Sequence, residues 1–174
     1  MVKPESHRPH ARPEPVELSS LEIEILMSGA GIEAKGRTSS AAQDRRDRAL
    51  SLIRECRSLV TESYGLLAVA ELLEISPEET WGHAHREPRG LHAFRLDGDC
   101  PWLFPRWQFW GSNRIPGLRS ILAAAGKSVH PLSLSRFMLT KSVDLDIGEE
   151  CYSPRDWLIS GLDPTPVLMI ARDI

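Results

Sequence analysis

Histidine and cysteine side chains are the groups in this sequence that could form a reactive centre or bind a metal ion. His83 and His85 are two residues apart, so on a helix they point to different sides and make poor joint ligands. Cys56, Cys100 and Cys151 are widely separated and lack the CxxC spacing of a zinc site. The sequence also contains no G-x-S-x-G, P-loop or HExxH motif. We therefore expect no catalytic residue, no metal site and no cofactor.

An acidic stretch is the remaining candidate for cation binding. Asp144, Asp146, Glu149 and Glu150 lie within residues 140–152, which we expect to form a polar loop. The stretch lacks the ligand pattern of an EF-hand, so we expect a solvated loop. Its carboxylates could instead meet basic residues on a protein partner, which would speed association.

The bulk composition limits the class of protein. With 41% hydrophobic and 26% charged residues in 174, the chain is typical of a soluble globular protein of one or two small domains. Residues 61–110 carry four Lys/Arg against eight Asp/Glu, so charge alone predicts no tight non-specific binding of nucleic acid. Apolar runs are too short to cross a bilayer, and the first residues lack a secretory signal. We expect a cytoplasmic protein that is not bound to a membrane.

The N-terminal third divides into a tail and helices. Residues 1–17 carry four prolines and should be a disordered tail, because they cannot bury enough apolar surface. Residues 18–62 should form N-terminal helices with a possible role in dimerisation. The second of these helices should run to about Thr61, with an apolar face at helical spacing; its members are Ala49, Ile53, Cys56 and Val60.

Residues 63–112 have the pattern of a helix-turn-helix-like domain. Leu66–Glu74 carries apolar residues at helical spacing. Ser76 and Pro77 then provide a cap and a first helical residue, and Glu79 completes a capping box, so a second helix should start there. Two short helices joined by a tight turn are typical of a helix-turn-helix.

A β-hairpin "wing" should follow the second helix. Leu91–Leu96 alternates and Asp97-Gly98 is a hairpin turn signal, so the return strand is expected at Cys100–Phe104. The aromatic residues here could stack on nucleic-acid bases, but large aromatics commonly fill small cores, so we expect them under the wing; they are Trp102, Phe104, Trp107, Phe109 and Trp110.

DNA contacts, if this segment makes them, would come from the second helix and the wing. Glu78 and Glu79 lie in the first turn of that helix, where carboxylates oppose phosphate and can accept only from cytosine. The sequence therefore leaves open whether DNA binding is retained. The candidate DNA-binding residues are Ser76, Thr80, His83, Arg86, Arg89 and Arg95.

Residues 113–174 should form a bundle of short helices. Pro116, Pro131, Pro154 and Pro164 each suit the start of a helix. Helices this short are not stable alone in water, so they must pack together or on a partner. The predicted fold class is mainly α with a small β-hairpin wing, in which a helix-turn-helix segment precedes a short-helix bundle.

Two stretches, which together cover more than half of the chain, resemble known families. Residues 68–109 resemble the helix-turn-helix and wing of many small bacterial regulators, and share a phrase that reads here Phe104-Pro105-Arg106-Trp107-Gln108-Phe109. Residues 116–172 are similar to the C-terminal module of the Xre/MbcA/ParS-like antitoxins. The residues that carry this second resemblance are Pro116-Gly117-Leu118, Phe137-Met138-Leu139-Thr140, the run from Ser153 to Gly161, and Val167 with Ala171.

The second resemblance implies a function. Such antitoxins pair with RES-domain toxins, small enzymes that degrade NAD, so it implies a protein that blocks the toxin and represses its own operon. We also expect the protein to be a homodimer. Residues 113–174 would then be the toxin-binding or partner-binding module, with contacts from Phe137, Leu139, Thr140, Arg155, Trp157, Arg172 and Ile174. Two alternatives remain: a stand-alone DNA-binding transcriptional regulator, and a phage- or prophage-type adaptor that binds another protein.

Overall fold

Helices make up about half of the residues that the structure describes, as the sequence predicts. The computed structural model describes residues 39–148 and 150–174. Within them are seven α-helices and three antiparallel sheets of two strands each, so the prediction of a mainly α fold with small β elements is confirmed. None of these helices is both long and apolar enough to cross a bilayer. The predicted tail (1–17) and the first part of the predicted N-terminal helices (18–38) lie outside the described residues.

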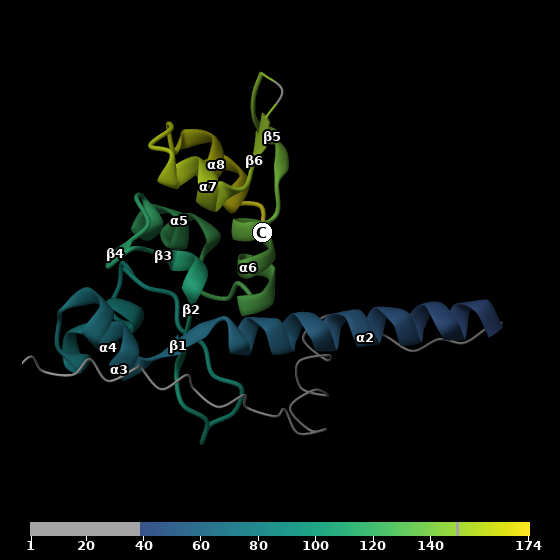
Figure 1. Cartoon of the computed structure of the whole chain (residues 1–174), viewed down its shortest axis with the longest axis horizontal. Helices are drawn as coiled ribbons and strands as arrows, with labels where there is room; N and C mark the ends of the chain where they lie inside the picture. Colours follow the sequence, from purple (N-terminus) through teal and green to yellow (C-terminus); the bar gives the residue numbers. More distant parts are fainter. Residues whose placement is uncertain (1–38, 149) are drawn as a thin grey trace, which may run out of the picture.

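The longest helix, α2 (Ser39–Thr61), packs on the rest of the protein through its C-terminal half only. Its N-terminal half projects away from the other elements (Figure 1), and Leu50 is 45% exposed. The C-terminal half contributes part of the predicted apolar face, Cys56 and Val60, to a small hydrophobic cluster. The other members of this cluster are Leu52, Leu59, Phe94 and Leu132, whereas the predicted Ala49 and Ile53 are only partly buried and lie outside it. An ion pair between Glu55 and Arg136 in α6 (Pro131–Leu139) fixes the same contact.

The predicted helix-turn-helix arrangement is present. Helix α3 (Leu66–Leu73) is followed after three residues by α4 (Pro77–His85). The capping box forms as expected: the Glu79 amide donates to Ser76 Oγ (3.1 Å), and the Ser76 amide donates to Glu79 Oε2 (3.0 Å). These bonds satisfy amide groups that the first turn of α4 would otherwise leave unpaired.

The predicted wing is replaced by a longer-range pairing. Instead of a hairpin between 91–96 and 100–104, a single antiparallel bridge joins Phe94 and Leu103. Strand β2 (Leu103–Pro105) pairs with β1 (Ser63–Gly65), which precedes α3. The return strand that the sequence assigns to the wing is thus shared with residues about forty positions earlier, and the wing prediction is wrong in this detail.

The second half of the chain contains the predicted short helices and two hairpins. The helices are α5 (Leu118–Ala125), α6, α7 (Pro154–Ile159) and α8 (Thr165–Ala171), and a 3₁₀ turn, η1 (Arg106–Gln108), precedes them. Strands β3 (Phe109–Trp110) and β4 (Asn113–Arg114) pair, as do β5 (Ser142–Ile147) and β6 (Glu150–Tyr152). The expectation of a polar loop at 140–152 is therefore wrong, because most of this segment is a hairpin.

One large core joins the helix-turn-helix segment to the short helices. Val69 and Ala84 of α3 and α4 belong to the same buried cluster as Ile121, Leu134 and Val167 of α5, α6 and α8. Of the five aromatics expected under the wing, Phe104, Trp107 and Phe109 are buried in this core, whereas Trp110 is 56% exposed. The suggested boundary at 112/113 does not separate two hydrophobic cores, and the domain division itself stays a prediction.

The three cysteines, all within the described residues, form no disulfide. Cys56 is buried between α2 and α6, and Cys151 in β6 is half-exposed. Burial is the main reason that the pKa of the Cys56 thiol is raised, and the neighbouring Glu55 carboxylate adds to the effect. Cys56 is therefore a small core residue rather than a nucleophile.

Candidate functional site

The residues proposed for DNA contact do not form one exposed surface. Thr80 is fully buried and its hydroxyl donates to the Ser76 carbonyl (3.0 Å), so it is not available to a ligand. Arg89 has little exposed side chain and donates to the Gly126 carbonyl (2.7 Å), which ties the segment after α4 to the end of α5. Ser76 is occupied in the capping box. These three residues thus have structural roles.

Three of the proposed DNA contacts remain accessible. Arg86 is exposed at the C-terminal end of α4. Arg95 is exposed, donates to the Gly98 carbonyl (2.9 Å) and lies 5.1 Å from the centre of the Trp102 ring. His83 is half-buried and lines a cleft on the α5 side of α4.

An aromatic cluster beside Arg95 was not expected from the sequence. The Trp81 and His85 rings stack with centroids 3.5 Å apart, and the Trp102 ring meets both edge-on. Trp81 is 39% exposed. The spacing of four residues between Trp81 and His85 was the signal for this contact, because residues i and i+4 are neighbours on a helix.

The residues proposed for partner binding fall into buried and exposed groups. Trp157 is 8% exposed and its indole N–H donates to the Asp163 carbonyl (2.6 Å), so it is a core residue. Phe137 is half-buried against the core. The exposed ones are Leu139 (56%), Thr140, Arg172 and Ile174 (40%).

Arg155, also proposed for partner binding, has contacts inside the protein. Its Nε donates to the Trp107 carbonyl (3.0 Å), and its Nη2 donates to the Phe109 carbonyl (3.4 Å). Its Nη1 lies 3.3 Å from an Asp156 carboxylate oxygen. Arg155 therefore connects the first turn of α7 to η1 and β3, and little of its hydrogen-bonding capacity is left for a partner.

Leu139, Thr140 and Arg155 line one groove, which we call the α2–α6 groove. It lies between the C-terminal half of α2, η1 and α6 and has a volume of about 430 Å³. Leu59 and Leu132 give it an apolar floor, whereas the Glu55–Arg136 pair lies on its wall. The resemblance had already suggested Leu139, Thr140 and Arg155 as partner contacts. Nothing in the sequence indicated that α2 forms the opposite wall of the groove.

Exposed apolar side chains gather in the last 36 residues. Five of the nine large hydrophobic residues exposed in the described part of the chain lie there, and we call them the C-terminal apolar set: Leu139, Val143, Ile147, Met169 and Ile174. Val143 is 79% and Met169 is 63% exposed. Helix α8 packs on β5, and Figure 1 shows the C-terminus beside α6 and β5. Sequence reasoning missed Val143, Ile147 and Met169, although the alternation in 142–147 was a signal for a strand.

Clustered metal-binding side chains are absent from the part of the chain that the structure describes. No group of three or more His, Cys, Asp or Glu side chains among residues 39–148 and 150–174 could hold a metal ion. Comparisons with protein-family models, with curated proteins and with solved structures gave no match. Arguments about function therefore depend on the surfaces described above.

Proposed function

We propose that this protein is an antitoxin-like protein of the cytoplasm whose C-terminal module, residues 113–174, binds and neutralises a RES-type NAD-degrading toxin. The observation that supports this most directly is the α2–α6 groove, where the exposed Leu139 and Thr140 lie together. Arg155 lines the same groove, and its internal hydrogen bonds hold α7 against η1 and β3. All three belong to the phrases that resemble the toxin-binding module of such antitoxins.

The exposed apolar residues support a macromolecular partner. Val143 and Met169 are each more than 60% exposed, and such side chains gain free energy when a partner removes them from water. The hairpin that carries Val143 also carries Asp144 and Asp146, which would favour a partner with a basic surface. Apolar contacts surrounded by polar side chains are the usual composition of a protein–protein interface.

The test is co-expression with a RES-type toxin in a bacterial host, followed by copurification. The wild-type protein should restore growth and elute with the toxin as one complex. A Leu139→Glu, Val143→Glu double variant should lose both, because two carboxylates would be desolvated in the interface. Both side chains are exposed, so the variant should fold normally.

Leu67→Glu provides the matched control. Leu67 is 71% exposed on α3, away from the C-terminal module, and its substitution should leave protection and copurification unchanged. Point variants are preferable to removal of residues 130–174, since that truncation would delete the core residues Leu134 and Met138. Full protection by the double variant, or no complex with the wild-type protein, would refute the proposal.

Operator binding by the α3–α4 segment is a second candidate, and the observation that favours it is the tight arrangement of the two helices with Arg86 exposed at the end of α4. A gel-shift assay with the protein's own promoter at low salt tests it. Arg86→Ala should weaken the retardation and reduce its salt dependence, because a phosphate contact would be lost. An unshifted promoter fragment at low salt removes this candidate.

A further inference from the structure

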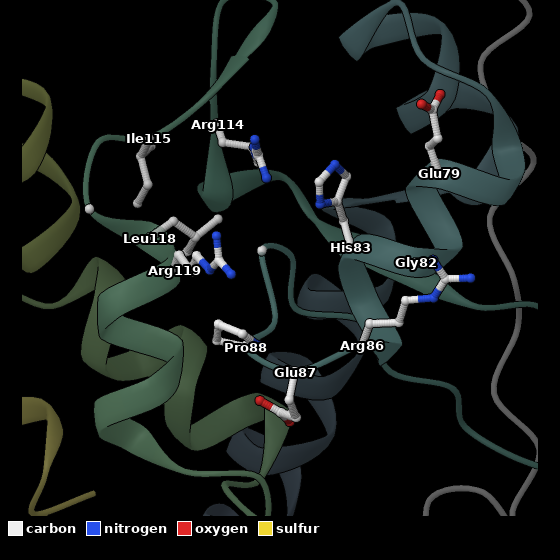
Figure 2. Close-up of a pocket in the computed structure, with 12 residues that line it drawn as sticks. Glu79, Gly82, His83, Arg86, Glu87, Pro88, Arg114, Ile115, Leu118 and Arg119 are labelled. Carbon is white, nitrogen blue, oxygen red and sulfur yellow. The ribbon is translucent and has the colours of Figure 1, made fainter.

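A second concave site shares no lining residue with the α2–α6 groove. It is a cleft of about 630 Å³ between α4 and the N-terminal end of α5 (Figure 2). Gly90 also lines it. This volume is within the range of sites that hold small molecules. Neither the resemblance nor the proposed function gives this cleft a role.

Positive groups face one another across this cleft. In Figure 2 the guanidinium groups of Arg114 (β4) and Arg119 (α5) and the ring of His83 (α4) point into the same space. Burial lowers the pKa of His83, and the charges of Arg114 and Arg119 lower it further, whereas Glu79 acts in the opposite direction. Both arginines are thus close enough to act on one imidazole, in agreement with their positions in Figure 2.

A glycine allows this close approach. A Cβ atom on Gly90 would lie 2.7 Å from Nη1 of Arg114 and 3.2 Å from Nδ1 of His83. A Cβ atom at position 90 would therefore require the end of the Arg114 side chain to shift. The backbone of Gly90 is itself held, because its amide donates to the His83 carbonyl (2.7 Å).

The carboxylates that line the cleft have other partners. Glu79 accepts from the Ser76 amide in the capping box, and Figure 2 shows it on the far side of α4 from Arg114. Glu87 pairs with Lys127 (3.3 Å) and Arg89 (3.6 Å). Within residues 39–148 and 150–174, neither Arg114 nor Arg119 forms an ion pair. Their charges are therefore available to an external anion.

We propose that this cleft binds the phosphoryl group of a small phosphorylated molecule, with Arg114 and Arg119 as its ligands. Two guanidinium groups supply the paired N–H donors that match phosphate oxygens, and the neutral His83 ring can add one more donor. Pro88 and Ile115 line the same cleft and provide apolar contact for the organic part of such a molecule.

A small ligand fits the surroundings better than a nucleic acid does. Glu78 and Glu79 are exposed in the first turn of α4, and residues 61–110 carry twice as many acidic as basic side chains. An extended polyanion would have to approach these carboxylates, which costs electrostatic energy at each phosphate. A single phosphoryl group inside the cleft avoids them.

Isothermal titration calorimetry of the full chain at low ionic strength tests the proposal, with inorganic pyrophosphate and AMP as probes and adenosine as the uncharged comparison. Pyrophosphate and AMP should bind saturably and adenosine should not. Arg114→Ala and Arg119→Ala should each weaken binding by roughly tenfold or more, since a charge-assisted hydrogen bond is lost. Gly90→Ala should also weaken it by displacing Arg114, and Arg172→Ala, which removes an exposed arginine outside the cleft, should have no effect.

Circular dichroism and urea unfolding show whether each variant is folded and as stable as the wild type. If Arg119→Ala does not fold, Arg119→Gln replaces it. The proposal is overturned if neither probe gives a saturable heat, or if the Arg114 and Arg119 variants bind as the wild type does. It is also overturned if a DNA duplex binds more tightly than AMP through the same two arginines. None of these outcomes depends on a toxin, so failure here is distinct from failure of the proposed function.

Discussion

The side chain of Gln108 pairs with the backbone of His92 through two hydrogen bonds. The His92 amide donates to Gln108 Oε1 (2.8 Å), and Gln108 Nε2 donates to the His92 carbonyl (2.9 Å) and also to the Pro105 carbonyl (3.1 Å). Both residues are buried, so the Gln108 amide supplies the hydrogen bonds that a neighbouring strand would otherwise give to the His92 N–H and C=O groups.

Replacing Gln108 should therefore be costly. Gln108→Leu replaces the polar amide with an apolar side chain of similar volume. The backbone groups of His92 then lose their partners in the core. We expect the free energy of unfolding to fall by about 2–4 kcal/mol, measured by urea denaturation. Gln43→Leu is the control, because Gln43 is exposed on α2 and its loss should cost less than about 0.5 kcal/mol. Equal stability of the two variants would contradict this role of Gln108.

The His92 ring predicts a pH dependence of stability. Burial, with a smaller contribution from Arg89, lowers its pKa to about 4, and neither ring nitrogen has a hydrogen-bond partner in the described structure. The unfolded chain, with a pKa near its usual 6.5, takes up the proton first as the pH falls, so stability is lost between pH 6.5 and 4. From pH 7.5 to 5 this single group should cost about 2 kcal/mol.

His92→Phe removes this titration and keeps a flat ring of similar size beside Trp107. Urea unfolding of both proteins across this pH range should give a flatter dependence for the variant, while the carboxylates contribute equally to both. Parallel curves would show that His92 is not the group responsible.

Arg155 should be more important for stability than for recognition. Arg155→Lys keeps the charge but cannot reach the Trp107 and Phe109 carbonyls in the same fixed geometry, so we expect a loss of about 1–2 kcal/mol. Arg155→Ala should cost somewhat more, because the two carbonyls lose both donors. Thermal and urea unfolding measure this, with Arg172→Ala as the exposed control. If the Arg155→Ala protein is as stable as the wild type but fails to bind a toxin, Arg155 contacts the partner and this prediction is wrong.

Helix starts were predictable because their signals are local. Ser76-Pro77 and Ser153-Pro154 give a side-chain cap followed by a proline at the first helical position, and both helices begin there. The N-cap of α6 was not predicted. It is His130, whose ring Nδ1 accepts from the Leu132 amide, and histidine is uncommon at this position.

Strand pairing was less predictable, because it depends on distant segments. Leu103–Pro105 could pair with the preceding 91–96 or with Ser63–Gly65, and no local pattern decides between them. The hairpin at 142–152 was accessible to sequence reasoning: Val143, Leu145 and Ile147 alternate with aspartates. Its acidic content led instead to the expectation of a loop.

The candidate sites show a similar division. The resemblance suggested Trp157 as a partner contact, and a place on the second helix suggested Thr80 as a DNA contact. Both side chains are buried, and burial depends on how the helices pack. The cleft at Arg114 and Arg119 unites β4 and α5 with α4, whose His83 precedes Arg114 by 31 positions in the sequence. Only the folded chain brings these groups together.

The cysteines differ in burial, so one of them can be labelled selectively with a fluorescent dye. Cys56 is enclosed between α2 and α6 with a raised thiol pKa, so a maleimide dye should leave it unmodified in the native protein. In a Cys100→Ser background the dye would then attach at Cys151, which pairs with Asp146 across the hairpin. A fluorophore there would report in real time whether any macromolecule has covered the end of the hairpin, without advance knowledge of what that molecule is.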